Sequence, residues 1–287
     1  MKNKNKAIFF VIISAAAFAG MNLFVKLSGD LPTMQKCFFR NFVALFFAVG
    51  IMLRQKVSFI PPKGTFKFIF CRSLFGGLGM IANFYAIDHL VIADASMLNK
   101  LSPFFAIIFS IILIKEIPKP YQVVCVVTAF LGALFILKPG ASGLLNFPAF
   151  IGLLGGAGAG LAYTNVRLAT SKGAPKPLIV AFFSCFTCLL CLPWFIANFT
   201  PMSGFQLFCL IMAGSCATVG QFGITSAYAL APASEISVYD YSMIIFAAIL
   251  GMLFLDEVPD VLSIIGYVVI IGSGVAMFFK SRKISAQ

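Results

Sequence analysis

Apolar runs long enough to cross a lipid bilayer recur along this whole chain, and this feature limits its fold more than any other. Ten such runs lie at residues 7–27, 37–53, 66–87, 95–114, 121–137, 147–168, 177–199, 205–230, 234–255 and 261–279. A hydrocarbon core about 30 Å thick is crossed by about 20 helical residues. Only 10% of the 287 residues are charged, against roughly a quarter in soluble domains. The sequence therefore predicts an all-α integral membrane protein with ten transmembrane helices.

The basic residues are distributed unevenly between the two sides of this expected bundle. The net charge is +12, an excess that in a soluble protein would suggest nucleic acid. Here most Lys and Arg residues fall on one side, whereas the opposite connections hold only Lys26, Lys36 and Lys138. Basic residues collect on the cytoplasmic side of membrane proteins. We therefore expect a multi-pass protein of the cell (inner) membrane with both termini cytoplasmic, which contacts the lipid bilayer and not nucleic acid.

The first apolar run also has the pattern of a secretory signal peptide. It follows a basic start and contains Ala17-Phe18-Ala19, a small-residue cleavage pattern. Because the apolar character continues through residues 21–25, a retained first span is the preferred interpretation.

Three short motifs recur about half a chain apart. YAI at 85–87 returns as YAL at 228–230, ADAS at 93–96 as APAS at 231–234, and KEIP at 115–118 as DEVP at 256–259. The spacing between the two copies is nearly the same for all three motifs. We expect two five-helix repeats, residues 1–140 and 141–287. Since five is an odd number, the second repeat enters the membrane with opposite polarity, and such inverted repeats are the basis of alternating access.

The same region resembles a known family. Asn83-Phe84-Tyr85-Ala86-Ile87, then Leu101-Ser102-Pro103-Phe104-Phe105, then Glu116 resemble the EamA-type transporters of the drug/metabolite superfamily. The resemblance implies a ten-helix secondary carrier of small metabolites or drugs. The position that matches Pro103 in the second repeat is Ile244, so the helix distortion that a proline causes need not occur in the ninth helix.

Charged residues inside spans indicate where a carrier binds its substrate, since each costs roughly 2.5 to 3.5 kcal/mol on insertion scales. At a rise of about 1.5 Å per residue, Arg72 and Asp240 lie at a similar depth, each about 9 Å from the inner end of its helix. We predict that they face one cavity and either pair with each other or bind opposite charges of a substrate. Lys100 lies some 12 Å from the depth of Asp240, so no direct bond between these two is expected.

Arg40 and Glu235 fall within two turns of span ends, where a charged side chain reaches the interface by snorkelling. The candidate substrate-binding residues of the central cavity are Arg72, Asn83, Lys100, Tyr163, Gln221, Tyr239 and Asp240. Asp240 has a second interpretation, uptake of a proton that couples transport to the proton gradient. Each polar residue has the alternative role of joining helices, and a charged pair that of orienting them.

Other motifs predict packing rather than chemistry. Cys185, Cys188 and Cys191 have the spacing that opens a ferredoxin motif but lack the fourth cysteine, so no metal or other cofactor is expected. Gly152, Gly156 and Gly160 favour close helix packing. No Walker A motif is present, which excludes an ATP motor in this chain.

These observations predict a secondary transporter of a small organic metabolite, either an amino acid or related zwitterion or a drug-like compound. The transporter is expected as a monomer or homodimer, with protons as a candidate coupling partner. The alternatives are a membrane-embedded enzyme that acts on a lipid-like substrate and a non-transporting membrane scaffold.

Overall fold

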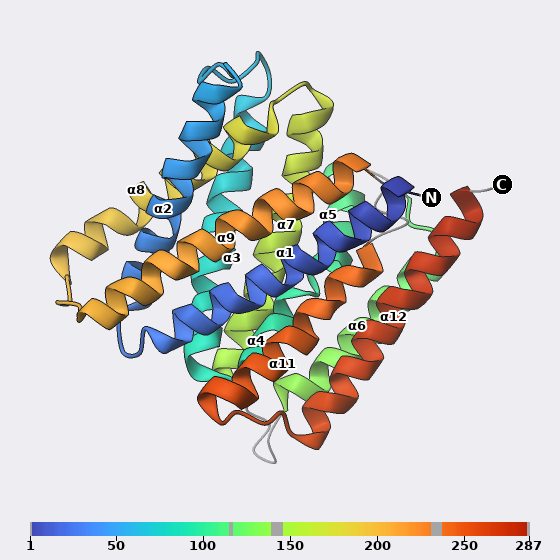
Figure 1. Ribbon diagram of the computed structural model, residues 1–287. Coiled ribbons are helices and arrows are strands. Elements are labelled where there is room, and N and C mark those ends of the chain that lie inside the picture. The colour runs from blue at the N-terminus through green and yellow to red at the C-terminus, as the bar shows by residue number, and fades with distance from the viewer. Residues whose placement is uncertain (1, 115–116, 139–145, 231–236, 286–287) are drawn as a thin grey trace.

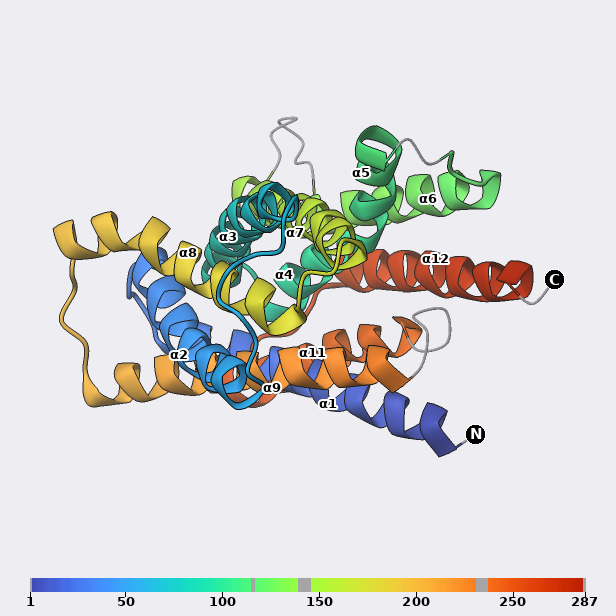
Figure 2. The same ribbon diagram turned by 90° about the horizontal axis from the view of Figure 1, so that it is seen from above.

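A computed structural model describes residues 2–114, 117–138, 146–230 and 237–285, and these residues are helical apart from short connections. Figures 1 and 2 show a single bundle of long helices. Its elements are α1 (Lys2–Leu27), α2 (Thr33–Arg54), α3 (Phe66–His89), α4 (Ile92–Asn99), α5 (Ser102–Ile114), α6 (Pro120–Leu137), α7 (Phe147–Ser171), α8 (Lys176–Ala197), α9 (Gly204–Leu230), the 3₁₀ helix η1 (Ser237–Tyr241), α11 (Ser242–Leu255) and α12 (Val261–Ser285).

The helices match the expected spans closely. Within the described residues, nine helical segments are long and apolar enough to cross a membrane, and a shorter apolar helix covers Tyr239–Leu255. Their surfaces agree with a lipid environment, since large side chains such as Phe46, Ile112 and Val268 are exposed at 77%, 65% and 67%. The chain is therefore a multi-pass membrane protein.

The helices pack in pairs that combine the two halves of the sequence. α1 packs along α9 and α3 along α7, while α2 packs with α8 and α6 with α12. The shift of half a chain that relates the repeated motifs converts α1 into α7 and α3 into α9, so the first two pairs exchange with each other. This pattern is typical of a duplicated bundle whose halves interlock.

Two of the apolar segments are not continuous α-helices. The fourth is divided into α4 and α5, with Lys100 and Leu101 between them and Pro103 in the first turn of α5. Proline has no N–H with which to continue an α-helix through this point. The described part of the ninth segment starts with the 3₁₀ helix η1 and becomes α-helical at Ser242. It is therefore irregular at the equivalent place even though Ile244 replaces the proline.

The glycines of α7 allow close contact, as predicted. A Cβ atom added to Gly156 would overlap the carbonyl oxygen of Leu98 at the end of α4, and one added to Gly158 would lie 2.9 Å from the Cα of Gly79 in α3. The absence of side chains lets these backbones approach each other, which replaces the hydrophobic drive that lipid does not provide. α7 thereby fixes the position of α3 and of the break between α4 and α5.

The two ends of the bundle differ in charge. At one end, here called the acid-paired end, Lys26 bonds Glu257, while Lys36 lies 2.6 Å from Asp88 and Lys138 2.6 Å from Asp260. The hydrogen bond from Lys138 holds the pKa of the Asp260 carboxyl below its usual value, because it favours the charged form. The opposite end, here called the basic end, contains the start of α1 and the end of α12 (Figures 1 and 2). Because successive spans alternate in direction, the ends of α2 and α7 and the beginnings of α3, α6 and α8 also lie there. These helix ends carry Arg54, Lys67, Lys119, Lys172 and Lys176.

Candidate functional site

A cavity of about 130 Å³ lies in the middle of the bundle, and both halves of the chain form its wall. Its apolar wall includes aromatic and methionine side chains: Phe18, Met21, Met80, Phe84, Phe183 and Met243. Its polar lining residues are Asn22, Arg40, Arg72, Asn83, Asn99, Lys100, Tyr163 and Gln221. An apolar wall with a few polar groups is typical of a site for a small organic molecule.

The structure places five of the seven candidate residues on this wall, namely Arg72, Asn83, Lys100, Tyr163 and Gln221. Asp240 reaches the wall indirectly, through its bond to Lys100. Tyr239 is 38% exposed and is not among the residues that line the cavity. Asn165, a further polar residue of α7, bonds the carbonyl of Leu161 in its own helix.

Arg72 is held by its own helix and by α8. Gly76 lies one turn further along α3, and a Cβ atom there would overlap the Nη1 atom of Arg72. The guanidinium fills this space and stacks on the Phe183 ring, with 4.2 Å from Cζ to the ring centroid. Its Nε atom is buried without a hydrogen-bond partner among the described residues. This cation–π contact orients the side chain, and no described acidic side chain compensates its positive charge.

Arg40 also belongs to the cavity, and the interpretation of Arg40 as a snorkelling residue is wrong. The residue is only 5% exposed. Its Nη1 atom donates to Asn41 Oδ1 at 2.9 Å, and its Nε atom is buried without a partner among the described residues. Counting turns from the helix end does not reveal that α8 and α9 cover this part of α2. Glu235, the other residue given this interpretation, lies outside the described residues.

The predicted relation between Arg72, Lys100 and Asp240 is also wrong. Lys100 Nζ lies 2.5 Å from Asp240 Oδ2, although no bond between them was expected. The depth estimate assumed straight α-helices, whereas Lys100 lies at the break between α4 and α5 and Asp240 lies in η1. A 3₁₀ helix rises about 2.0 Å per residue instead of 1.5 Å, and the long lysine side chain extends further. Asp240 therefore pairs with Lys100 and not with Arg72.

The neutral polar residues of the cavity are only partly satisfied. Asn22 Nδ2 donates to Ser96 Oγ at 3.0 Å and joins α1 to α4. The Oδ1 atoms of Asn22 and Asn83 are buried without a hydrogen-bond partner among the described residues. Since buried polar groups are usually hydrogen-bonded, these atoms are candidates for contact with water or a ligand.

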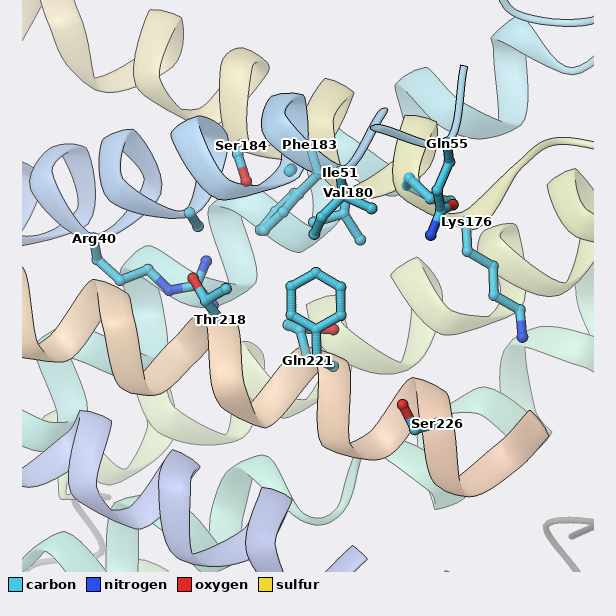
Figure 3. Close-up of a pocket in the computed structure, with 14 residues that line it drawn as sticks. Arg40, Ile51, Gln55, Lys176, Val180, Phe183, Ser184, Thr218, Gln221 and Ser226 are labelled. Atoms are coloured by element: carbon cyan, nitrogen blue, oxygen red, sulfur yellow. The ribbon is translucent and has the colours of Figure 1, made fainter. Parts of the chain in front are cut away.

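A second cavity of about 330 Å³ leads from this centre toward the basic end, between α2, α8 and α9. It shares Arg40, Phe183 and Gln221 with the central cavity. Figure 3 shows Arg40 at one end of it, directed toward Thr218, and Gln55 and Lys176 at the other. This cavity thus extends from residues that also line the central cavity to residues at the basic end.

A third cavity of about 540 Å³ lies at the basic end between α5, α6 and α7. Tyr163 lines both this cavity and the central one, and Lys119 and Arg167 add basic groups to its wall. The central site is thus bordered by two cavities on the side of the basic end.

The acid-paired end is joined by polar contacts between the two halves of the chain. Lys26 at the end of α1 bonds both Glu257 and the carbonyl of Leu90. Glu257 Oε2 also accepts a hydrogen bond of 2.8 Å from the backbone N–H of Ile92. Asp256 has a left-handed backbone with φ 53° that ends α11 and turns Glu257 toward these partners. Glu257 thereby links α1 and α4 to the connection between α11 and α12.

Clusters of metal-binding residues are not found within the described parts of the chain, where no three His, Cys, Asp or Glu residues could hold an ion together. Of the three cysteines in α8, Cys188 and Cys191 are buried and Cys185 is exposed.

The chain belongs to the EamA-like transporter family, whose model matches residues 5–138 and again residues 146–279. The two matches indicate a duplicated repeat. Because this is a family of transporters, the two alternative predictions, a membrane-embedded enzyme and a non-transporting scaffold, are wrong. The chain is a membrane transporter.

Several characterised and uncharacterised proteins are similar along nearly their whole length. The pseudopaline exporter CntI of Pseudomonas aeruginosa is 31% identical over 94% of this chain and 95% of its own. The S-adenosylmethionine uptake transporter of Rickettsia prowazekii is 21% identical over 88% of this chain and 85% of its own. A solved crystal structure with 16% identity covers 98% of this chain with a TM-score of 0.67, which supports the fold.

Proposed function

We propose that this protein is a secondary transporter that moves a small organic metabolite across the cell membrane by alternating access. The observation that carries this proposal is the central cavity, whose wall combines Arg40 and Arg72 of the first half with Tyr163, Phe183 and Gln221 of the second. A site between two halves changes its exposure when one half tilts against the other.

The proposed mechanism uses two inverted repeats, residues 1–140 and 141–287. The exchange of the pairs α1–α9 and α7–α3 supports this arrangement. So does the position of the helix irregularities, since Lys100 beside the break in the fourth segment and Tyr241 at the end of η1 occupy equivalent places in the two repeats. Discontinuous helices at a repeat interface are a common feature of carrier binding sites.

The orientation proposed here places the basic end and both termini in the cytoplasm. The rule that basic residues collect on the cytoplasmic side supports it. In this orientation both additional cavities face the cytoplasm, because they lie toward the basic end, which supports an inward-facing conformation in the proposed transport cycle.

Arg72, Asn83, Lys100, Tyr163 and Gln221 are the proposed substrate contacts, with Asp240 acting through Lys100. A proton on Asp240 would neutralise its carboxylate and weaken the 2.5 Å bond to Lys100. Lys100 would then be free to bind a substrate group. The pair therefore provides a route by which a proton gradient could drive transport.

The test is uptake of a metabolite pool by proteoliposomes with and without a pH gradient, for the wild type and for Asp240→Asn. We expect the gradient to accelerate flux in the wild type and to have no effect on the variant, because asparagine does not exchange a proton. Gradient-stimulated flux in Asp240→Asn would contradict the role of Asp240. Absence of any flux in the wild type would contradict the proposed transport function itself.

A further inference from the structure

The charges around the central cavity do not balance. Lys100 and Asp240 form a pair and contribute no net charge. Arg40 and Arg72 both line the cavity, and within the described residues neither forms an ion pair with an acidic side chain. In the part of the chain that the structure describes, the site thus has two positive charges without an acidic partner.

These two guanidinium groups also have unused hydrogen-bond donors. A guanidinium has five N–H donors, and among the described residues Arg40 has one hydrogen bond, to Asn41. Arg72 has the stacking contact with Phe183, and the Nε atoms of both arginines are buried without partners. Ionisable groups inside a membrane protein are generally paired, or else they mark the path of a substrate. Since no acidic side chain among the described residues supplies that partner, an anion bound from solution would supply it.

We propose that the substrate is a small organic dicarboxylate, with one carboxylate bound by Arg40 and the other by Arg72. This inference rests on the proposed transport function and narrows its substrate class. A guanidinium binds a carboxylate through two parallel hydrogen bonds. Two positive charges match two carboxylates, and the apolar carbon chain between them would contact Phe183 and Met243 on the cavity wall.

The same cavity has acceptors for a substrate that also bears an amino group. The buried Oδ1 atoms of Asn22 and Asn83 lack partners among the described residues, and a substrate ammonium group would donate to them. An amino dicarboxylate therefore satisfies both arginines and both asparagines, whereas a simple amino acid has only one carboxylate for the two arginines.

The experiment compares ligands on the purified protein in detergent, with thermal unfolding as the measurement. The probes are succinate, glutamate, alanine and putrescine, which differ in the number of carboxylates and amino groups. We expect succinate and glutamate to raise the unfolding temperature at concentrations at which alanine and putrescine have no effect. Stabilisation by alanine or putrescine at an equal or lower concentration, or none by either dicarboxylate, would overturn the inference.

Variants show which residues bind the anion. Arg40→Gln and Arg72→Gln should each raise the dissociation constant of the dicarboxylate about 10- to 100-fold, because each removes a charged hydrogen-bond partner of the ligand. Arg54→Gln is the matched control, because Arg54 lies on α2 with Arg40 but is exposed, and it should bind like the wild type. Arg72→Lys keeps the positive charge but lacks the paired donors of arginine, so its dissociation constant should lie between those of the wild type and Arg72→Gln. This variant still tests the proposal if a glutamine variant does not fold. Equal affinity in Arg54→Gln and in both cavity variants would overturn the proposal.

Transport in proteoliposomes separates this inference from the function on which it rests. If the vesicles take up dicarboxylates, the result supports both the substrate class and the transport function. If they take up a neutral or cationic metabolite and no dicarboxylate, the substrate class is wrong and the transporter remains. If they take up no solute, the proposed transport function fails first.

Discussion

Gly76 and Arg72 lie one turn apart on α3, and the small residue provides the space that the guanidinium occupies. The sequence alone suggests Arg72 as a functional residue, because charge inside a span is costly. It does not reveal the role of Gly76, which depends on the direction of the Arg72 side chain. A residue can thus matter to the site through its own chemistry, as Arg72 does, or through the space that it leaves for a neighbour, as Gly76 does.

Gly76→Ala should separate function from stability. The new methyl group would displace the Arg72 guanidinium from Phe183, because it would overlap Nη1. Since the displaced atom ends a flexible side chain, and alanine is more stable than glycine within a helix by about 0.5 to 1 kcal/mol, the unfolding temperature should not fall. Substrate affinity should fall about tenfold, which corresponds to 1.4 kcal/mol.

The measurement for Gly76→Ala is substrate affinity together with thermal unfolding in detergent. Gly50→Ala in α2 is the control, because nothing lies within 4 Å of its added Cβ atom, and both quantities should stay at or above wild-type values. A variant at Gly76 with unchanged affinity would show that the position of Arg72 is unimportant for binding.

Side-chain pairing at the centre illustrates what sequence patterns leave open. The apolar runs place Arg72, Asn83 and Lys100 correctly inside spans. A polar residue within an apolar run is visible in the sequence itself, without knowledge of the tertiary structure. The partner of Lys100 depends on the break before α5 and on the 3₁₀ helix η1, and no residue near Asp240 signals the latter. Depths counted along ideal helices therefore gave the wrong partner for Asp240.

At the scale of helices, the charged residues of the acid-paired end act as links between elements. Lys26 and Glu257 join α1 to the end of α11, across the two halves of the chain. Lys36 and Asp88 join α2 to α3 within the first half. Alternating access requires contacts between the halves to open on one side at a time. The Lys26–Glu257 pair should therefore oppose that opening, and the Lys36–Asp88 pair should not.

Glu257→Gln should therefore favour the conformation that is open at the acid-paired end. The side chains of Lys26 and Glu257 are 18% and 15% exposed, so loss of the charge pair weakens a largely buried link. A shift of about 1.4 kcal/mol would increase the open population about tenfold. The measurement is the rate at which a membrane-impermeant thiol reagent labels Asn22→Cys in the cavity from the acid-paired side.

The matched control is Asp88→Asn, which makes the same chemical change at the same end. It removes a 2.6 Å pair that stays within one half, so the labelling rate of Asn22→Cys should not change. Equal acceleration in both variants would indicate general loosening of this end instead of a link between the halves.

At the scale of the molecule, the boundaries of the helices follow from composition and the arrangement of the halves does not. Apolar runs bounded by charges predict α6, α7 and α8 to within a few residues, because the thickness of the bilayer sets their length. The pairing of α1 with α9 and of α3 with α7 cannot be read from any local pattern in the sequence. Only the recurrence of short motifs indicates it, and two of these motifs include residues outside the described parts, namely 115–116 and 231–234.

The polarity of the two halves leads to a prediction about the whole molecule. Ile117 and Val258 occupy equivalent places in the repeated Glu-x-Pro motifs, and both are accessible, with exposures of 93% and 68%. If the halves are inverted, these positions face opposite sides of the membrane. In intact cells, a membrane-impermeant thiol reagent should label Val258→Cys directly, and Ile117→Cys only after permeabilisation. Cys185, which is exposed, is first replaced by serine. Labelling of both positions from the same side would exclude inverted repeats and with them the rocking motion.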